Sequence, residues 1–210
     1  MIREDEIAGK LPFYEKLNKK QKELILNNCY KQTFNKGEQY VCEKEEDAVF
    51  VKKGALNVFM VGDNGEETYL YRVNKDEVFI TNGKLLYEFI GNGETLTLPA
   101  EYVQILSNGN VNAENFLLRA RVKHAESGIA QINSVFFASV DKRIANYLIN
   151  QTMRSHNHIV NATHEQIAKF IGSSREVVTR RLKVMEEAGA VTLSRGKVSI
   201  VSREYIKRLK

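Results

Sequence analysis

The segment SSREVVTRRLKV, residues 173–184, places hydroxyl, guanidinium, carboxylate and ammonium groups at the spacing of one helix face. Its apolar residues fall on the opposite face, which leaves the polar groups outside. In the major groove of DNA, an arginine can donate two hydrogen bonds to guanine, and a glutamate can accept one from the cytosine amine. Arg175, Glu176 and Arg180 are therefore the candidates for reading bases. The alternative is a solvated face on which Glu176 and Arg180 form an ordinary ion pair.

A second set of side chains around this segment could hold DNA phosphates without reading sequence. Hydroxyl groups, lysines, arginines and the amides at helix N-termini all contact phosphate oxygens. The candidates are Thr163, Ser174, Lys183, Arg195 and Lys197. We expect such contacts to fix the position of the helix on the duplex.

Two short helices separated by a glycine-containing turn are predicted to carry these groups. Thr163 and Gln166 have the spacing of a capping box, and their helix is expected to end at Gly172. Ser173 and Glu176 repeat that spacing and predict the start of the second helix. Helices joined by so short a turn cross at a steep angle, which is the geometry of a helix-turn-helix.

The helix-turn-helix is preceded by a further helix and followed by a hairpin. Ile144, Tyr147 and Leu148 mark the earlier helix. The run VTLSRGKVSIV, residues 191–201, consists of two β-rich segments around Arg195-Gly196, which predicts a hairpin that would form a wing. The side chains expected in the core of this part are Ile167, Ala168, Ile171, Val177, Val178, Leu182 and Met185.

From residue 111 the apolar period changes to three and a half residues. One seam consists of Val111, Leu118, Ala125 and Ile132, and the adjoining one of Asn115, Val122, Ile129 and Phe136. These heptads predict a helix of about 27 residues that pairs with a copy of itself. The side chains predicted to form the dimer contact are Leu118, Val122, Ala125, Ile129, Ile132 and Phe136. Gly128 favours the alternative, a core helix packed on its own domain, because glycine weakens a free helix by about 1 kcal/mol.

The N-terminal half alternates short apolar segments with turn residues. The strand region runs from about Tyr30 to Leu98, and its segments are YVCEK, AVFVKKG, ALNVFMV, ETYLYRV, DEVFI, LLYEFI and TLTLP. Their spacing of about ten residues suits an antiparallel sandwich or barrel. A short amphipathic helix pair is expected before them, in residues 11–29, and one more short helix after them, in residues 99–106.

Composition and charge limit the classes of protein that remain. The chain has 210 residues, 43% of them hydrophobic and 27% charged, which suffices for one large or two small folded domains. No apolar run approaches the roughly 20 residues of a membrane span, so we expect a cytoplasmic protein without membrane contact. Residues 139–210 hold 14 Lys and Arg against 6 Asp and Glu, an asymmetry typical of a part that meets a polyanion.

The run IAKFIGSSREVVTRRLKVMEEAGAVTLSRGKVSI, residues 167–200, resembles the winged helix-turn-helix of the cyclic-AMP receptor/fumarate-nitrate regulator (Crp/Fnr) family of bacterial transcription factors. FNKGEQYVCEKEEDAVFVKKGALNVF, residues 34–59, is similar to the family's sensor β-roll, and the heptad helix to its dimerisation helix. The resemblance implies an α+β fold in three parts. These are a cyclic-nucleotide-binding-like β-roll (jelly roll) in residues 1–110, a dimerisation helix in 111–138 and a winged helix-turn-helix in 139–210.

The resemblance also implies a homodimer that binds double-stranded DNA at an inverted repeat. In the cyclic-AMP receptor, an Arg, a Glu and a further Arg read TGTGA-type half-sites. Arg175, Glu176 and Arg180 match those motif positions, so a similar half-site is implied. Val177 departs from the usual Thr, which puts one phosphate contact in doubt. An activator of this family would also contact RNA polymerase.

The sensor part departs from the family's cyclic-nucleotide-binding pattern. That pattern has a Gly-Glu pair followed by Arg-Ser/Thr-Ala, in which the arginine neutralises the cyclic phosphate. The corresponding stretch, residues 78–99, contains no arginine. A bidentate, charge-assisted contact is among the strongest in such a site, so we expect an effector other than a cyclic nucleotide.

The chain also lacks the residues that would ligate the other cofactors of the family. An iron-sulfur cluster takes about four cysteine thiolates, and the chain has only Cys29 and Cys42. We interpret His124, His156, His158 and His164 as surface or satisfied side chains, not as haem or metal ligands. No cofactor and no metal is therefore predicted. A small apolar or aromatic acid in the β-roll, a thiol switch at either cysteine, or no effector at all stay open.

The sequence thus predicts a DNA-binding transcriptional regulator with an unidentified effector. The alternative is a regulatory module that binds a small molecule and acts through protein contacts, with weak or nonspecific DNA binding. An enzyme is not predicted, because the sequence has no P-loop, no GxSxG elbow, no HExxH and no convincing Ser/His/Asp arrangement.

Overall fold

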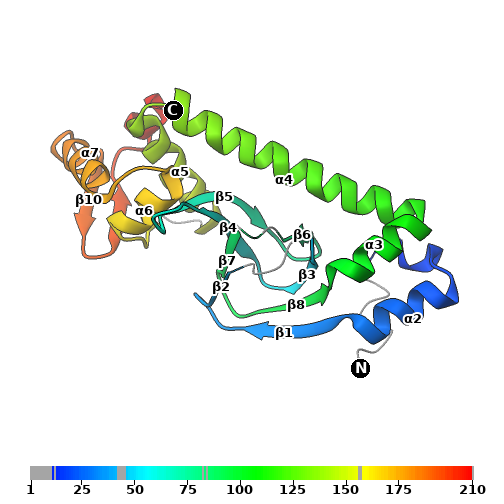
Figure 1. The fold of residues 1–210 in the computed structure, drawn as a ribbon. Helices are drawn as coiled ribbons and strands as arrows, with labels where there is room; N and C mark the ends of the chain where they lie inside the picture. Colours follow the sequence, from blue (N-terminus) through cyan, green and yellow to red (C-terminus); the bar gives the residue numbers. More distant parts are fainter. Residues whose placement is uncertain are drawn as a thin grey trace. The chain divides into compact units, whose positions relative to one another are not determined.

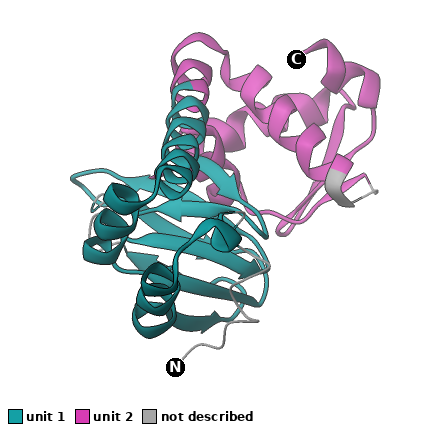
Figure 2. Ribbon diagram, turned by 90° about the vertical axis from the view of Figure 1, so that its right-hand side faces the viewer, with its two compact units in different colours: residues 1–66, 70–129 teal, residues 67–69, 130–210 magenta. Residues whose placement is uncertain are grey.

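The computed structural model describes residues 11, 13–41, 46–81, 83, 85–155 and 158–209, without the side chains of 154 and 155. The chain divides into two compact units, residues 1–66 with 70–129 and residues 67–69 with 130–210 (Figure 2). Within the described ranges, no helix has the length and apolar character needed to cross a membrane. The predicted α+β fold, with antiparallel sheets and a C-terminal helix-turn-helix, is confirmed.

Figure 1 shows the helices and strands in their order along the chain. The first unit begins with η1 (Tyr14–Lys16) and α2 (Lys19–Asn28). Its strands are β1 (Tyr30–Phe34), β2 (Gln39–Val41), β3 (Ala48–Lys53), β4 (Leu56–Val61), β5 (Glu67–Val73), β6 (Val78–Ile80), β7 (Leu85–Phe89) and β8 (Gly93–Leu98). Helix α3 (Ala100–Gly109) follows, and α4 (Val111–Phe137) runs on into the second unit. The remaining elements are α5 (Val140–Ser155), β9 (Ile159–Val160), α6 (His164–Ile171), α7 (Arg175–Glu187), β10 (Val191–Ser194), β11 (Lys197–Ile200) and α8 (Arg203–Arg208).

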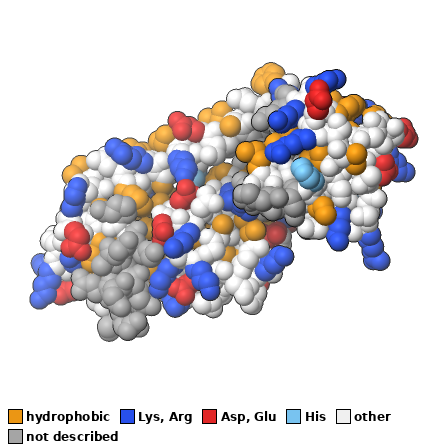
Figure 3. All heavy atoms as spheres, turned by 180° about the vertical axis from the view of Figure 1, so that it is seen from behind, with side chains coloured by type: hydrophobic (Ala, Val, Ile, Leu, Met, Phe, Trp, Pro, Cys, Tyr) orange, Lys and Arg blue, Asp and Glu red, His pale blue; other side chains and the backbone are white. Residues whose placement is uncertain are grey.

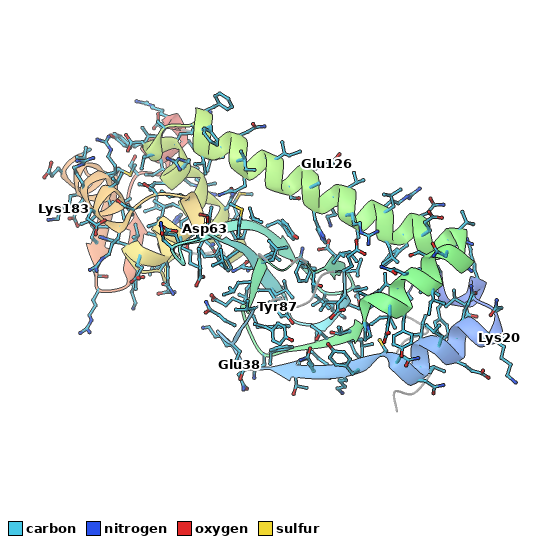
Figure 4. All side chains as sticks on the ribbon, viewed as in Figure 1. Lys20, Glu38, Asp63, Tyr87, Glu126 and Lys183 are labelled. Atoms are coloured by element: carbon cyan, nitrogen blue, oxygen red, sulfur yellow. The ribbon has the colours of Figure 1, made fainter. Side chains whose placement is uncertain are left out.

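The strands of the first unit form two four-stranded sheets, in the orders β1-β8-β3-β6 and β2-β7-β4-β5. Strand β3 is buried on both faces, which explains its continuous apolar run. Val49 and Val51 pack between the sheets, while Ala48 and Phe50 pack towards α2, α3 and α4. Tyr87 also belongs to the core between the sheets, as Figure 4 shows.

The structure corrects one prediction at the start of the chain and describes another only in part. The first member of the expected helix pair is a three-residue 3-10 turn, because the chain is already extended at Leu17 and Asn18 caps the next helix. The expected strand at residues 40–44 is described only as far as Val41, and the remainder of that segment lies outside the described residues. Strand β1, which pairs with β8, was not among the predicted segments.

Helix α4 is 27 residues long, as the heptads predicted. One face packs on the first unit through Ala113, Leu117 and Ala120, which are buried. The heptad seams lie on another face and are exposed, with Val122 at 48% and Phe136 at 78% exposure. The exposed apolar seam positions are Val111, Leu118, Val122, Ala125, Ile129, Ile132 and Phe136. The helix therefore packs on its own domain and still presents an uncovered apolar seam.

Gly93 tests the packing between the two sheets. A Cβ at this position would overlap the ring of Phe89, which stacks on Phe34 at 4.3 Å between ring centroids. We expect Gly93→Ala to lower the free energy of unfolding by about 1–3 kcal/mol, the usual cost of overpacking. Urea denaturation of the full chain measures this loss.

Gly91→Ala is the matched control, because a Cβ at Gly91 would meet nothing within 4 Å. It should change the free energy of unfolding by less than about 0.5 kcal/mol. Equal losses in the two variants would contradict the packing assigned to Phe89.

Candidate nucleic-acid interface

Helix α6, which precedes the turn, begins and ends as the sequence predicted. Thr163 caps α6, with its hydroxyl accepting a hydrogen bond from the Gln166 amide at 3.1 Å, while the Gln166 side chain accepts one from the Thr163 amide at 2.9 Å. Gly172 ends α6 in the left-handed region, at φ +63°, which costs glycine little. The capping box and the glycine stop are both confirmed.

The start of α7 differs from the prediction by one residue. Ser174, not Ser173, is the N-cap, and its hydroxyl accepts a hydrogen bond from the Val177 amide at 3.3 Å. Ser173 instead continues the turn and donates its amide to the Ala168 carbonyl. The spacing of Ser173 and Glu176 therefore predicted the N-cap one residue too early, because the turn after Gly172 is one residue longer than that spacing allows.

The inner face of α7 packs on the core of the second unit. Val178, Leu182 and Met185 are at most 2% exposed and contact side chains of α5, α6 and the wing. Val177, which the sequence analysis placed in the core, is only partly buried. The wing is confirmed as strands β10 and β11 around Gly196, and β9 extends it to a three-stranded sheet.

An open groove of about 590 Å³ lies between side chains on the outer face of α7 and is lined by Arg175, Glu176, Thr179, Arg180, Lys183, Val184 and Glu187. It holds all three residues predicted to read bases, together with Lys183, which Figure 4 labels on this helix. Glu176 and Arg180 are both described and form no ion pair with each other. The ordinary ion pair that was the alternative at this site is thus not formed.

Arg180 and Arg181 are neighbours in the sequence with different surroundings. Arg181 makes two hydrogen bonds to the Asp141 carboxylate of α5, one of them at 2.6 Å from its Nε. These bonds and the charge of Asp141 raise the pKa of the guanidinium. Arg180 is exposed on the groove side. One arginine therefore anchors α7 to α5, and the other is left for a ligand.

Arg143 of α5 fixes the far end of α6. Its Nη1 donates to the carbonyl oxygens of Ile171 and Gly172, the latter at 2.9 Å. A cation at a helix C-terminus also interacts favourably with the helix dipole. Burial lowers the pKa of this guanidinium. Asp141 and Arg143 together hold both helices of the helix-turn-helix, a role that the sequence analysis did not assign.

The predicted phosphate contacts lie on three different elements. Thr163 and Ser174 use their hydroxyl oxygens as helix caps, so each retains a hydroxyl proton to donate to a phosphate. Lys183 lines the groove. Arg195 and Lys197 are exposed at the tip of the wing, outside the groove lining. Figure 3 shows Lys and Arg side chains projecting from the C-terminal part at the right of the view.

The space between the sheets of the first unit is filled with aromatic rings. Phe79 and Tyr87 lie 5.6 Å apart, and His124 of α4 stacks on Tyr71 at 4.5 Å. Burial lowers the pKa of His124 to about 4, with Glu77 opposing the shift. The His124 imidazole is therefore neutral near pH 7 and lies half-buried against Tyr71.

Cys29 is buried, and burial raises the pKa of its thiol to about 12. A thiol of this kind carries almost no reactive thiolate near neutral pH, which argues against a redox switch there. Cys42 and His156 lie outside the described residues.

Comparisons with known proteins agree with this geometry. Residues 142–209 match the family model of the Crp-like helix-turn-helix domain. A structure from Eubacterium rectale, of a protein assigned to the Crp/Fnr family of transcriptional regulators, shares 26% sequence identity with this chain. The match has a TM-score of 0.85 and covers 96% of this chain and 98% of that one. The comparison with curated proteins finds no match.

More distant structures share the fold. The c-di-GMP-responsive global regulator CLP of Xanthomonas campestris is 16% identical, with a TM-score of 0.70 over 88% of this chain and 100% of that one. FixK2 of Bradyrhizobium japonicum is 14% identical, with a TM-score of 0.63 over 86% and 96%. The C-terminal part is thus a Crp-like helix-turn-helix domain, and the resemblance to Crp/Fnr transcriptional regulators is confirmed.

The bidentate pair of Arg181 with Asp141 generates a stability prediction. We expect Asp141→Ala to lower the free energy of unfolding by about 1 kcal/mol, because the pair is charge-assisted but partly exposed. Thermal and urea denaturation measure this loss.

Glu204→Ala is the matched control, since Glu204 pairs with Arg208 on an exposed helix surface. It should cost less than about 0.5 kcal/mol. A loss in Asp141→Ala no larger than in this control would show that the α5–α7 pair does not anchor the helix.

Proposed function

We propose that this chain, which carries a Crp-like helix-turn-helix domain on the fold of the Crp/Fnr transcriptional regulators, is a homodimeric and sequence-specific DNA-binding regulator. Residues 1–110 would form the sensor, 111–138 the dimerisation helix and 139–210 the DNA-binding domain. An activator of this type would also meet RNA polymerase. The observation that carries the proposal is the groove of α7, where two arginines and a glutamate face outward.

The side chains that line the groove on α7 carry the hydrogen-bonding groups needed to read bases. An α-helix fits the major groove, where Arg175 and Arg180 can each donate two hydrogen bonds to guanine. Glu176 can accept one from a cytosine amine. These groups suit a TGTGA-like half-site. The hydroxyls of Thr163 and Ser174, with Lys183, Arg195 and Lys197, would hold the flanking phosphates.

The exposed seam of α4 supports a dimer formed by two such helices. Large apolar side chains recur along it at heptad spacing, from Leu118 at 52% exposure to Phe136 at 78%. A seam of this kind is covered when a second copy packs along it. Two α7 helices carried about 34 Å apart would read an inverted repeat, with one DNA turn between half-site centres.

A break in the helical path separates the dimer seam from the DNA-binding domain. Helix α4 ends at Phe137 and α5 begins at Val140, so Ala138 and Ser139 form the connection. We place the hinge of the regulator here. An effector would change the arrangement of the DNA-binding domains only if it binds the two arrangements with different affinity.

The effector of this regulator is proposed not to be a cyclic nucleotide. Residues 78–99 supply no arginine for a cyclic phosphate. In addition, Phe79, Tyr87 and Phe89 occupy the core between the sheets and are at most 1% exposed. An anionic ligand would have to displace these apolar rings without a guanidinium from residues 78–99.

Arg180 and Lys197 test the division between base reading and phosphate contact. Arg180→Ala should cost about 1–3 kcal/mol at one base pair and relax specificity there. Lys197→Ala should weaken binding to all sequences alike and reduce the slope of log affinity against log salt by about 1. Fluorescence anisotropy with a selected site and its single-base variants, at several salt concentrations, measures both effects. The same response in both variants would refute the assigned roles.

Val122 tests the dimer seam. A buried glutamate at the centre of a paired seam is unfavourable, so Val122→Glu should give a monomer in analytical ultracentrifugation. Binding to an inverted repeat should then weaken by about 100-fold or more, because the two half-sites no longer bind together.

Ala130→Glu is the control, since Ala130 is exposed on α4 but lies off the seam. This variant should remain dimeric and keep its affinity for DNA. A wild-type chain that is monomeric while bound to its site would contradict the proposed assembly.

A further inference from the structure

The start of α6 contacts the outer face of α7 through a side-chain pair that the proposed function does not use. His164 is the first residue of α6, and its Nδ1 lies 2.9 Å from the Thr179 hydroxyl oxygen. Thr179 is half-buried and lines the same groove as Arg175, Glu176 and Arg180. The imidazole therefore makes a hydrogen bond with a hydroxyl that borders the proposed base-reading surface.

The direction of this hydrogen bond decides what the hydroxyl can offer to a ligand. A hydroxyl has one proton to donate and two lone pairs to accept with. When Nδ1 accepts that proton, Thr179 presents only lone pairs to the groove. When Nδ1 carries a proton and donates it, the hydroxyl proton is released and can be donated to the groove.

These two states suit different bases. In the major groove, cytosine and adenine present an amine that donates hydrogen bonds, whereas guanine O6 and thymine O4 accept them. When the Thr179 hydroxyl can only accept a hydrogen bond from the DNA, it matches a base amine. When it can donate its proton, it matches a carbonyl oxygen of a base. The neutral imidazole allows the first state, and the imidazolium, with a proton on both nitrogens, permits only the second.

We propose that His164 is a positioning residue for base reading, which sets the hydrogen-bond direction of Thr179 and so makes the preference at one base pair depend on protonation. The proposal rests on the DNA-binding function proposed above. Thr179 would be the group that touches the base, and His164 would act through it.

The charges around His164 determine when it becomes protonated. Burial lowers the pKa of this imidazole, and the positive charges of Arg175 and Lys183 on α7 lower it further. On α5, Asp141 is engaged with Arg181, and Arg143 with the carbonyls at the opposite end of α6. Glu165, the next residue on α6, is exposed. His164 is therefore neutral in the free protein at neutral pH.

Bound DNA changes this balance, because its phosphates bring negative charge to the N-terminal ends of α6 and α7. Negative charge favours the imidazolium and raises the pKa of His164 in the complex. A group whose pKa rises on binding takes up a proton, so its contribution to affinity is present at low pH and lost as the pH rises. The affinity can change by at most about tenfold per pH unit for each His164.

Competition between half-site variants at about pH 8 and about pH 5.5, a range that brackets histidine titration, tests the proposal. The full-length protein is used with duplexes that carry each of the four base pairs at each half-site position. At one position, a preference for cytosine or adenine at high pH should shift towards guanine or thymine at low pH. The shift should be about fivefold, which corresponds to one hydrogen bond.

Two variants separate positioning from a merely structural role. Thr179→Val keeps the side-chain shape without the hydroxyl, and His164→Gln keeps a polar group that does not titrate. Both should lose the pH-dependent shift, and Thr179→Val should also lose the preference at that base pair, because its hydroxyl is the group proposed to touch the base. His158→Gln is the control and should retain the shift, because His158 is exposed and is not a partner of Thr179.

Failure of the role proposed for His164 and failure of the proposed DNA-binding function give different results. A wild-type preference that does not change with pH, or a shift that persists in Thr179→Val or in His164→Gln, would overturn the role of His164. Absence of any sequence preference at either pH would instead overturn the proposed function itself.

Discussion

The proposed function depends on a division of charge within α7. Arg181 is held by Asp141 of α5, whereas Arg175, Glu176 and Arg180 face outward and make no ion pair with one another among the described residues. The internal pair fixes the helix on its domain. The helix that carries the outer groups is therefore already in place, and only their side chains have to be ordered when a ligand binds.

Much of this arrangement was predictable because it rests on local spacing. The capping box at Thr163, the stop at Gly172, the wing and the length of α4 depend on residues a few positions apart. The pairs Asp141–Arg181 and His164–Thr179 join residues 40 and 15 positions apart, and only the packing of three helices brings them together. The Ser174 cap was missed because Ser173 has the expected spacing to Glu176, whereas the turn after Gly172 extends through Ser173.

Helix α4 connects the proposed sensor with the proposed dimer contact. Its buried face, with Ala113, Leu117 and Ala120, belongs to the core of the first unit, the proposed sensor, and His124 on the same helix stacks against Tyr71. Its exposed seam is the surface proposed to pair with a second copy. In the proposed dimer, a change in the packing of this core would act directly on the helix that would set the distance between the two recognition helices.

Selection of bound sequences from a random pool of duplexes, with the full-length protein at physiological salt, is the decisive experiment for a dimer that reads DNA with two α7 helices. We expect an inverted repeat with two TGTGA-like half-sites, whose centres are about one helical turn, or about 10 base pairs, apart. A consensus without two-fold symmetry, or enrichment of no sequence at all, would contradict it.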